Sequence, residues 1–188
     1  MKKLCILVCT AAVLLASQSF AEGFDYESRC ENPSLRSKTV ENKVVDCLGA
    51  LASLHLKNVT VTRVEVVGYL DAESSNIGEL FSVSSVILNN TTINKMTDIE
   101  NTLTAIDSVF RDKLMVSNTL TFNNTKSVDI EVGYPINGPE RKTHSIYLNN
   151  KSQINGNIVF ISGFNNKVYI SGNSLVNGKV INGTIIYK

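Results

Sequence analysis

The spacing of apolar residues changes along the chain near residue 58. Between Val40 and Leu54, apolar residues recur at steps of three and four, which predicts an amphipathic helix with Thr39 as its N-cap. From Val59 onward, apolar residues alternate with polar ones in a segment rich in Val, Ile, Thr, Ser and Asn, as is typical of strands. We therefore expect one short helix followed by an all-β region over residues 58–188.

The β region contains an internal repeat with a period of about 16 residues. Shifting the sequence by one period superimposes like residues at its beginning and its end, whereas the middle, from about Glu100 to Ser145, is out of phase. There Leu88-Asn89-Asn90-Thr91 resembles Phe122-Asn123-Asn124-Thr125, which lies two positions later than two full periods predict and indicates short insertions at corners. The superimposed sets are Val64, Leu80 and Met96; Val67, Val83 and Ile99; Ile77, Ile93 and Val109; Leu148, Phe164 and Val180; Asn150, Asn166 and Asn182; and Ile154, Ile170 and Ile186.

A repeat of this length favours a β-solenoid. One unit forms two or three short strands and cannot bury its own apolar face, but units stacked about 4.8 Å apart pair their backbones and align like side chains. Asn suits the corners between strands, because it tolerates the left-handed backbone conformation. We therefore predict an all-β, β-helix-like solenoid with coils of about 16 residues, whose first coil is capped by the short helix. The alternative is an antiparallel β-sandwich, which also contains many short strands but needs no fixed period.

Residues 1–21 have the three parts of a secretory signal peptide. Lys2 and Lys3 give a positive start, an apolar run extends from Leu4 to Ala16, and Ser19-Phe20-Ala21 places small residues at the cleavage positions. The apolar run is too short to cross a bilayer as a helix. We expect cleavage after Ala21, so that the mature chain is secreted or periplasmic, and the Met-Lys-Lys start is typical of a bacterial protein.

Two of the four cysteines, Cys30 and Cys47, remain after cleavage of the signal peptide. A lone pair in an oxidising compartment most simply forms a disulfide, which here closes a loop of about 17 residues and contributes roughly 3 kcal/mol in the chain-entropy model. The alternative is two free thiols, or half of a metal site. With the disulfide, residues 22–57 form a lead-in and a capping helix that are linked to each other.

Charge and hydropathy limit the classes of partner. The chain has 18 basic and 17 acidic residues, and the loss of Lys2 and Lys3 leaves a net charge of −1. Proteins that bind nucleic acid usually carry a basic face, so we expect no nucleic-acid partner. No second apolar run of spanning length follows the signal peptide, and we therefore expect no membrane span in the mature chain.

No group of residues has the spacing of a catalytic, metal or cofactor site. His55 and His144 have no Cys, Glu or second His at a ligand spacing. The carboxylates are scattered, and Glu79 falls one period before Lys95, which indicates an ion pair at the surface. The glycines fall at expected turns, with no helix after them that could cradle a phosphate. The sequence therefore predicts no catalytic residue, no metal and no cofactor.

One loop is a candidate for partner binding. The segment from Tyr134 to His144 holds both prolines of the repeat region. Proline removes a donor from a strand ladder, so this segment is expected to leave the sheet. Arg141, Lys142 and His144 would then present two basic groups and an imidazole to an acidic partner. The alternative is a solvated bulge without a partner.

The C-terminal coil is a second candidate for association. The chain stops at Ile185-Ile186-Tyr187-Lys188 immediately after a matched repeat, so the last coil is expected to expose an unpaired strand edge at Ile185, Ile186 and Tyr187. Pairing with a second copy would give an end-to-end homodimer. The alternative is that the lead-in, Glu22 to Pro33, folds across this end.

These patterns favour an exported, non-enzymatic binding or structural protein of the cell envelope or extracellular space, with a protein or a polysaccharide as its partner. The alternative is a carbohydrate-active enzyme, a polysaccharide hydrolase or lyase, on the same β-helix scaffold. Fold alone does not distinguish these functions, because one fold supports many of them.

Overall fold

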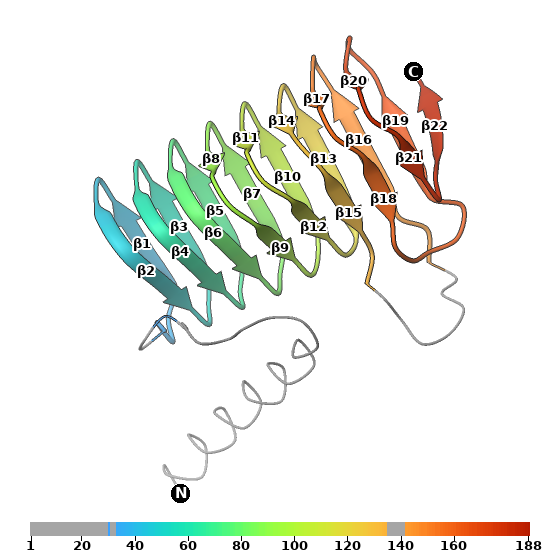
Figure 1. Cartoon of the computed structure of the whole chain (residues 1–188). Coiled ribbons are helices and arrows are strands. Elements are labelled where there is room, and N and C mark those ends of the chain that lie inside the picture. Colours follow the sequence, from blue (N-terminus) through green and yellow to red (C-terminus); the bar gives the residue numbers. More distant parts are fainter. Residues whose placement is uncertain (1–29, 31–32, 135–141) are drawn as a thin grey trace, which may run out of the picture.

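The chain winds into a β-solenoid of about eight turns (Figure 1). The structure is a computed structural model that describes Cys30, residues 33–134 and residues 142–188. Within these residues all regular elements are strands, and the strands of successive coils pair in parallel. The predicted solenoid is confirmed, and the antiparallel sandwich is wrong. The predicted signal peptide, residues 1–21, and residues 22–29 of the lead-in lie outside the described residues.

Two parallel sheets form the wall of the solenoid. The nine-stranded sheet consists of β1 (Lys38–Glu41), β3 (Leu54–Lys57), β5 (Leu70–Glu73), β7 (Val86–Asn89), β10 (Leu103–Ile106), β13 (Thr119–Asn123), β16 (Ser145–Asn149), β19 (Lys167–Ile170) and β22 (Thr184–Tyr187). The thirteen-stranded sheet consists of β2 (Val44–Ala50), β4 (Thr60–Val66), β6 (Asn76–Ser82), β8 (Thr92–Ile93), β9 (Thr97–Ile99), β11 (Val109–Phe110), β12 (Leu114–Val116), β14 (Lys126–Ser127), β15 (Ile130–Val132), β17 (Gln153–Ile154), β18 (Ile158–Phe160), β20 (Leu175–Val176) and β21 (Val180–Ile181). After β6, each coil contributes two short strands to this sheet in place of one long strand.

The register of the nine-stranded sheet gives the length of each coil. Strands β3, β5 and β7 follow one another at the interval of 16 that the sequence predicts. From β7 to β10 and on to β13 the interval is 17. Leu80 therefore pairs with Thr97 rather than Met96, and Ile93 pairs with Phe110 rather than Val109, one position later than predicted. Two such longer coils account for the position of Phe122 relative to Leu88, and the predicted insertions are confirmed.

The repeat predicted near the C-terminus, with the same period as the N-terminal one, is wrong. Leu148 pairs with Ile170 rather than lying beside Phe164, because the interval between β16 and β19 is 22. Asn150 and Asn165 both adopt the left-handed conformation, but Asn150 follows β16 and Asn165 precedes β19. The two Asn-Asn-Lys segments therefore form different corners, and a segment without strands between β18 and β19 lengthens the coil.

The helix predicted over Val40 to Leu54 is wrong, and the solenoid begins with β1. The segment forms β1, β2 and the first residue of β3, and parallel pairing with later coils satisfies its backbone. Val40 and Leu48 point into the core, whereas Val44 is 83% exposed. A corner at Asn42, with φ of 52°, separates β1 from β2. The two short strands carry apolar residues on both faces, and the corner shifts the pattern of the second strand relative to the first. Together these residues recur at steps of three and four, as they would in a helix.

Residues in the left-handed conformation, most of them Asn as predicted, form the corner that follows each of the first seven strands of the nine-stranded sheet. Their side chains also connect the coils, because the Asn58 amide donates to the Asn42 side-chain oxygen at 2.7 Å and the Asn124 amide to Asp107 at 2.6 Å. The left-handed residues of this corner are Asn42, Asn58, Ser74, Asn90, Asp107, Asn124 and Asn150.

After the corners from Asn58 to Asn150, one inward residue of each coil uses a side-chain hydroxyl of the next coil as its hydrogen-bond acceptor. The N–H of Val59 donates to Ser75 Oγ at 3.2 Å, and the N–H of Thr91 donates to Ser108 Oγ at 3.1 Å. This hydroxyl ladder continues through six coils, and none of the sequence patterns predicts it. Its members are Ser75, Thr91, Ser108, Thr125, Ser152 and Ser174.

Replacing Thr125 with Val tests the hydroxyl ladder. Thr125 is fully buried, accepts the Ser108 N–H at 3.3 Å and donates to the carbonyls of Ala105 and Asn123, both at 3.0 Å. Valine keeps the shape but leaves a buried N–H unpaired, so the free energy of unfolding in urea is expected to fall by about 2 kcal/mol. The same change at outward-facing Thr121 is the control and should stay within about 0.5 kcal/mol. Equal losses at the two positions would contradict the role of the ladder.

Candidate binding surface

The outer face of the nine-stranded sheet carries an area without charged side chains. On β7, β10, β13 and β16, inward residues such as Val86, Leu103 and Leu120 are buried, and the residues between them point outward. Because the strands are in register, the outward residues form three rows that run along the solenoid axis. We name this area the uncharged face; its residues are Ser85, Ile87, Asn89, Thr102, Thr104, Ile106, Thr119, Thr121, Asn123, Ser145, Tyr147 and Asn149.

Charged residues lie on both sides of the uncharged face along the axis. On β3 and β5, Lys57 lies 3.4 Å from Glu73 and the His55 imidazole lies 3.7 Å from Asp71. At the other end, Lys167 belongs to β19. Within the uncharged face the polar groups are hydroxyls and amides, and Thr102 Oγ1 donates to Ser85 Oγ of the preceding coil at 2.9 Å. The face is thus a bounded array of neutral hydrogen-bonding groups.

An aromatic stack forms one end of the uncharged face. The rings of Tyr147 and Tyr169 are parallel within 7° with their centroids 4.9 Å apart, which matches the distance between neighbouring coils. The Lys188 ammonium lies 4.4 Å from the centroid of Tyr169 and 5.8 Å from that of Tyr147. Tyr169 of the following coil covers one side of the Tyr147 ring. The other side of that ring is therefore directed toward Thr121, which pairs with Tyr147 from the preceding coil; we call the outward residues of one strand a rung.

A second cluster lies on the thirteen-stranded sheet, where two carboxylates of β9 and the following corner meet a tyrosine. The Tyr134 hydroxyl donates to Asp98 Oδ1 at 3.0 Å, and Asp98 is only 4% exposed. Burial raises the pKa of Asp98, although the Tyr134 hydrogen bond opposes this effect. Burial, and secondarily the charge of Asp98, raises the pKa of Glu100 from 4.5 to about 7. Glu100 therefore titrates near neutral pH.

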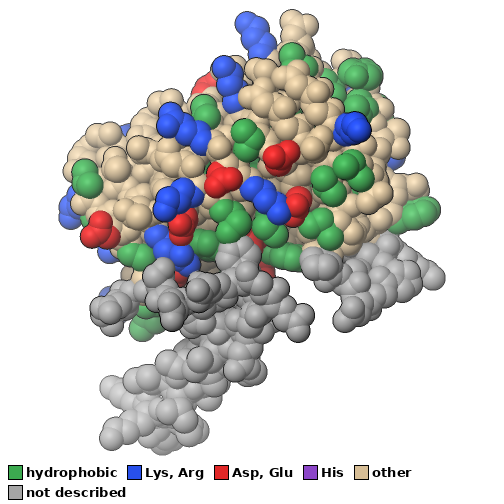
Figure 2. All heavy atoms as spheres, viewed as in Figure 1, with side chains coloured by type: hydrophobic (Ala, Val, Ile, Leu, Met, Phe, Trp, Pro, Cys, Tyr) green, Lys and Arg blue, Asp and Glu red, His purple; other side chains and the backbone are tan. Residues whose placement is uncertain are grey.

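The same sheet also carries an ion-pair network near the first coils. Arg63 contacts Glu65 at 2.7 Å and Glu79 at 2.9 Å, and its guanidinium lies 4.4 Å from the centre of the Phe81 ring. The predicted pairing of Glu79 with Lys95 is confirmed at 3.3 Å. Acidic and basic side chains are interspersed on the face shown in Figure 2. These charges pair with each other and do not form an area of single sign.

The disulfide predicted between Cys30 and Cys47 is present. It attaches Cys30 to β2 in the first coil. The Cys30 N–H also donates to Glu65 of β4 at 3.3 Å. Residues 22–29, 31 and 32 of the predicted lead-in lie outside the described residues, so its alternative position across the C-terminal end of the solenoid stays a prediction.

The structure describes two of the three residues predicted to form a partner-binding loop. Arg141 lies outside the described residues, and Lys142 is exposed. His144 is 1% exposed, and its backbone N–H donates to Asn166 Oδ1 at 3.1 Å. A Cβ on Gly163 would approach the imidazole to within 2.4 Å, so this glycine makes room for the buried ring. In this conformation, therefore, only Lys142 of the described pair reaches solvent, and His144 does not.

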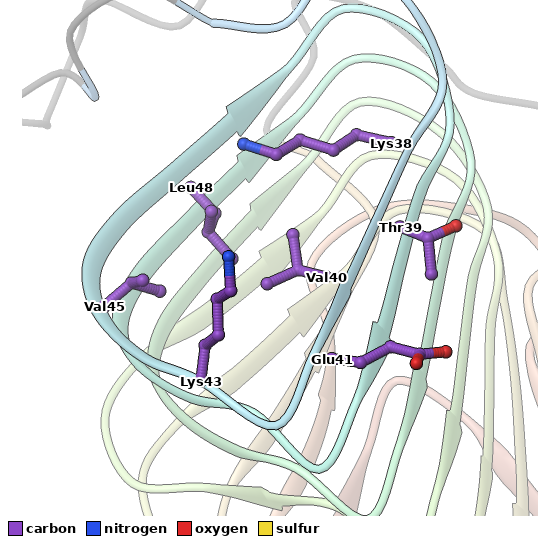
Figure 3. A pocket seen from close by; sticks show the side chains of 7 residues that line it. All are labelled: Lys38, Thr39, Val40, Glu41, Lys43, Val45 and Leu48. Atoms are coloured by element: carbon purple, nitrogen blue, oxygen red, sulfur yellow. The ribbon is translucent and has the colours of Figure 1, made fainter.

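A shallow hollow lies at the N-terminal end of the solenoid (Figure 3). Val40, Val45 and Leu48 line its apolar part, and Lys38 and Lys43 extend over it from the rim. At the C-terminal coil, β22 is the last strand of the nine-stranded sheet, Ile185 and Ile186 are half-buried, Tyr187 is 77% exposed, and Lys179 and Lys188 are exposed charged residues.

No protein-family model, curated protein or solved structure matches the chain. Residues 33–134 and 142–188, together with Cys30, contain no cluster of His, Cys, Asp or Glu that could hold a metal ion. In the same part of the chain no helix is long and apolar enough to cross a membrane. The chain is thus defined by its fold, as a β-solenoid protein.

The pH dependence of stability tests the environment of Glu100. Its folded-state pKa lies above the unfolded value, so wild-type stability is expected to decrease as the pH rises from 4.5 to about 7. Glu100→Gln removes this decrease, and should be more stable than wild type at pH 8 by about 1 kcal/mol after allowance for solvent screening. Below pH 4.5 the two proteins should agree. Urea denaturation between pH 4 and pH 8 measures the difference in stability, and Glu41→Gln at an exposed site is the control. Stability profiles of Glu100→Gln and wild type that run parallel over this pH range would contradict the raised pKa of Glu100.

Proposed function

We propose that the protein is an exported, non-enzymatic binding protein of the cell envelope or extracellular space. In this proposal the solenoid is a rigid support that presents the uncharged face to an extended partner. The observation that carries the proposal is the run of twelve outward positions on four neighbouring strands without a single charge. Charged residues are depleted, and tyrosine is enriched, at the centres of protein interfaces.

Two features support export. The segment from Met1 to Ala21 has the pattern of a signal peptide, and the Cys30–Cys47 disulfide is of a kind that persists in oxidising compartments. A rigid disulfide-bonded support without charge on one face suits binding to a partner outside the cytoplasm. The final location, secreted or periplasmic, belongs to the same proposal.

A carbohydrate-active enzyme is the second candidate function, and the cluster of Asp98, Glu100 and Tyr134 favours it. Glycoside hydrolases use one carboxylic acid with a raised pKa beside a second carboxylate. Glu100, with a pKa of about 7 beside Asp98, has the first of these properties. The two functions separate experimentally, since the cluster and the uncharged face lie on different sheets.

Charge introduced on the uncharged face should abolish partner binding. We expect the double variant Thr104→Lys, Thr121→Lys to fold normally but to bind immobilised envelope and host polysaccharides at least about tenfold more weakly, because two desolvated ammonium groups would meet the partner. Thr62→Lys, at an exposed position of β4, is the matched control and should bind as wild type.

Product analysis in the same screen distinguishes binding from catalysis. Binding without cleavage supports the proposal. Cleavage that Glu100→Gln abolishes, with binding retained, would establish the enzyme in its place. Unchanged binding by the double lysine variant would remove the uncharged face from consideration.

A homodimer through the C-terminal coil is part of the proposal. Exposed large apolar side chains near this end are Phe164 at 63%, Leu175 at 43%, Ile181 at 41% and Tyr187 at 77%, and a smaller group near the N-terminal end includes Leu35 and Val44. The outer strand β22 can pair with its counterpart in a second copy, antiparallel across a two-fold axis. Lys38, Glu41 and Lys43 disfavour the same pairing at the N-terminal end, since charged side chains blunt a strand edge.

Light scattering tests the dimer. Wild-type mature protein is expected at twice the monomer mass at micromolar concentrations, and Tyr187→Lys, which places a charge in the paired edge, at the monomer mass. Val44→Lys, at an 83% exposed apolar residue of the first coil, is the control and should remain dimeric. A monomeric wild type, or a dimer that Tyr187→Lys leaves intact, would contradict the proposal.

A further inference from the structure

We infer that the ligand of the uncharged face is a neutral, β-1,4-linked glycan that lies along the solenoid axis with one sugar over each of β7, β10 and β13. The inference rests on the proposed function and adds the chemical class of the ligand and its direction. It follows from three properties of the face: the spacing of its rows, the absence of charge and the orientation of Tyr147.

The spacing of outward groups differs in the two directions of the sheet. Along the axis, equivalent side chains such as Thr104 and Thr121 are separated by one coil, about 4.8 Å; along a strand, outward residues are about 6.7 Å apart. In a β-1,4-linked hexose chain, the glycosidic bonds at C1 and C4 of each sugar are both equatorial. The chain is therefore extended, and each sugar adds about the length of one ring to it. That advance is close to the coil spacing and shorter than the spacing along a strand. A chain parallel to the axis therefore places each sugar over the outward side chains of one strand.

The side chains of the uncharged face determine the charge of the ligand. Serine and threonine hydroxyls both donate and accept hydrogen bonds, and asparagine amides do the same through two different atoms, so the face matches the hydroxyls of a sugar. Uronic acid or sulfated chains need Arg or Lys as partners, and the twelve residues include neither. The ligand class that fits is a neutral glycan.

Tyr147 limits the length of the glycan that the face holds. Ile87, Thr104 and Thr121 precede Tyr147 in the central row. Because the Tyr147 ring stacks on Tyr169, its plane stands across the axis, and its open side faces the Thr121 rung. A glycan above the three preceding rungs meets this ring with its terminal sugar. The face thus holds about three sugars, one for each rung, and the aromatic ring packs against the C–H groups of the last one.

Titration calorimetry with neutral oligosaccharides tests the inference. Cello- and chito-oligosaccharides from two to six sugars are the probes, and maltotriose is the α-linked comparison. The affinity is expected to increase from two sugars to about three or four and then to level off, in line with the number of rungs. Tyr147→Ala should weaken the binding of the trisaccharide about tenfold. Tyr69→Ala, on the outer side of the same sheet beyond the uncharged face, is the matched control and should leave binding unchanged; thermal melts of both variants verify the fold.

Each remaining outcome overturns the inference. Equal affinity for maltotriose would exclude an extended chain along the rungs, and an unchanged affinity in Tyr147→Ala would exclude the aromatic end. The inference also fails if none of these oligosaccharides binds while Thr104→Lys, Thr121→Lys still abolishes binding of a partner found in the wider screen. In that last case the proposed function stands, so the failure of the ligand class and the failure of the binding face are distinguishable.

Discussion

One backbone constraint organises the solenoid: the direction of the hydrogen-bond ladder reverses at each Asn corner. The N–H of Asn58 donates to the carbonyl of Glu73 in the following coil, whereas the N–H of Thr60 donates to the carbonyl of Lys43 in the preceding one. The N–H of the residue between them points into the bore without a carbonyl partner. A buried unpaired N–H costs about 1–3 kcal/mol. One hydroxyl per coil removes this cost, and the hydroxyl ladder therefore fixes a Ser or Thr at one inward position of a mostly apolar interior.

This constraint explains which parts of the fold the sequence could predict. The parallel stacking, the strands and the left-handed Asn corners follow from residue types that repeat, and these predictions are confirmed. The hydroxyl ladder is equally periodic, but Ser and Thr are so frequent in this chain that only the correct register distinguishes the buried ones. That register requires coil lengths of 16, 17, 22 and 26 in the nine-stranded sheet, and a single fixed period of 16 conceals the three longer ones.

The errors have a common physical origin, because local spacing does not reveal where a corner lies. Val40 and Val44 are separated by one turn of a helix, yet the corner at Asn42 sends their side chains in different directions. His144 lies in a polar stretch of sequence, yet it is buried because Gly163 leaves space for its ring. The uncharged face was missed for the same reason. Thr102-Leu103-Thr104 recurs as Thr119-Leu120-Thr121, one position later than the predicted period, so a search at the longer period would find it.

The direction of the hydrogen bonds also gives the rod an uneven resistance to force. All ladder bonds between coils run along the axis, so tension applied at the two ends loads them one strand at a time, and the coils peel off in succession. A load across the axis is shared by all coils at once. The Cys30–Cys47 disulfide lies in the first coil. A pull on the N-terminal segment therefore passes through the covalent bridge directly to β2 and bypasses the loop between the two cysteines, so that β1 cannot be peeled away from that side. A covalent bond thus protects β1 from tension, whereas β22 is held by hydrogen bonds and packing.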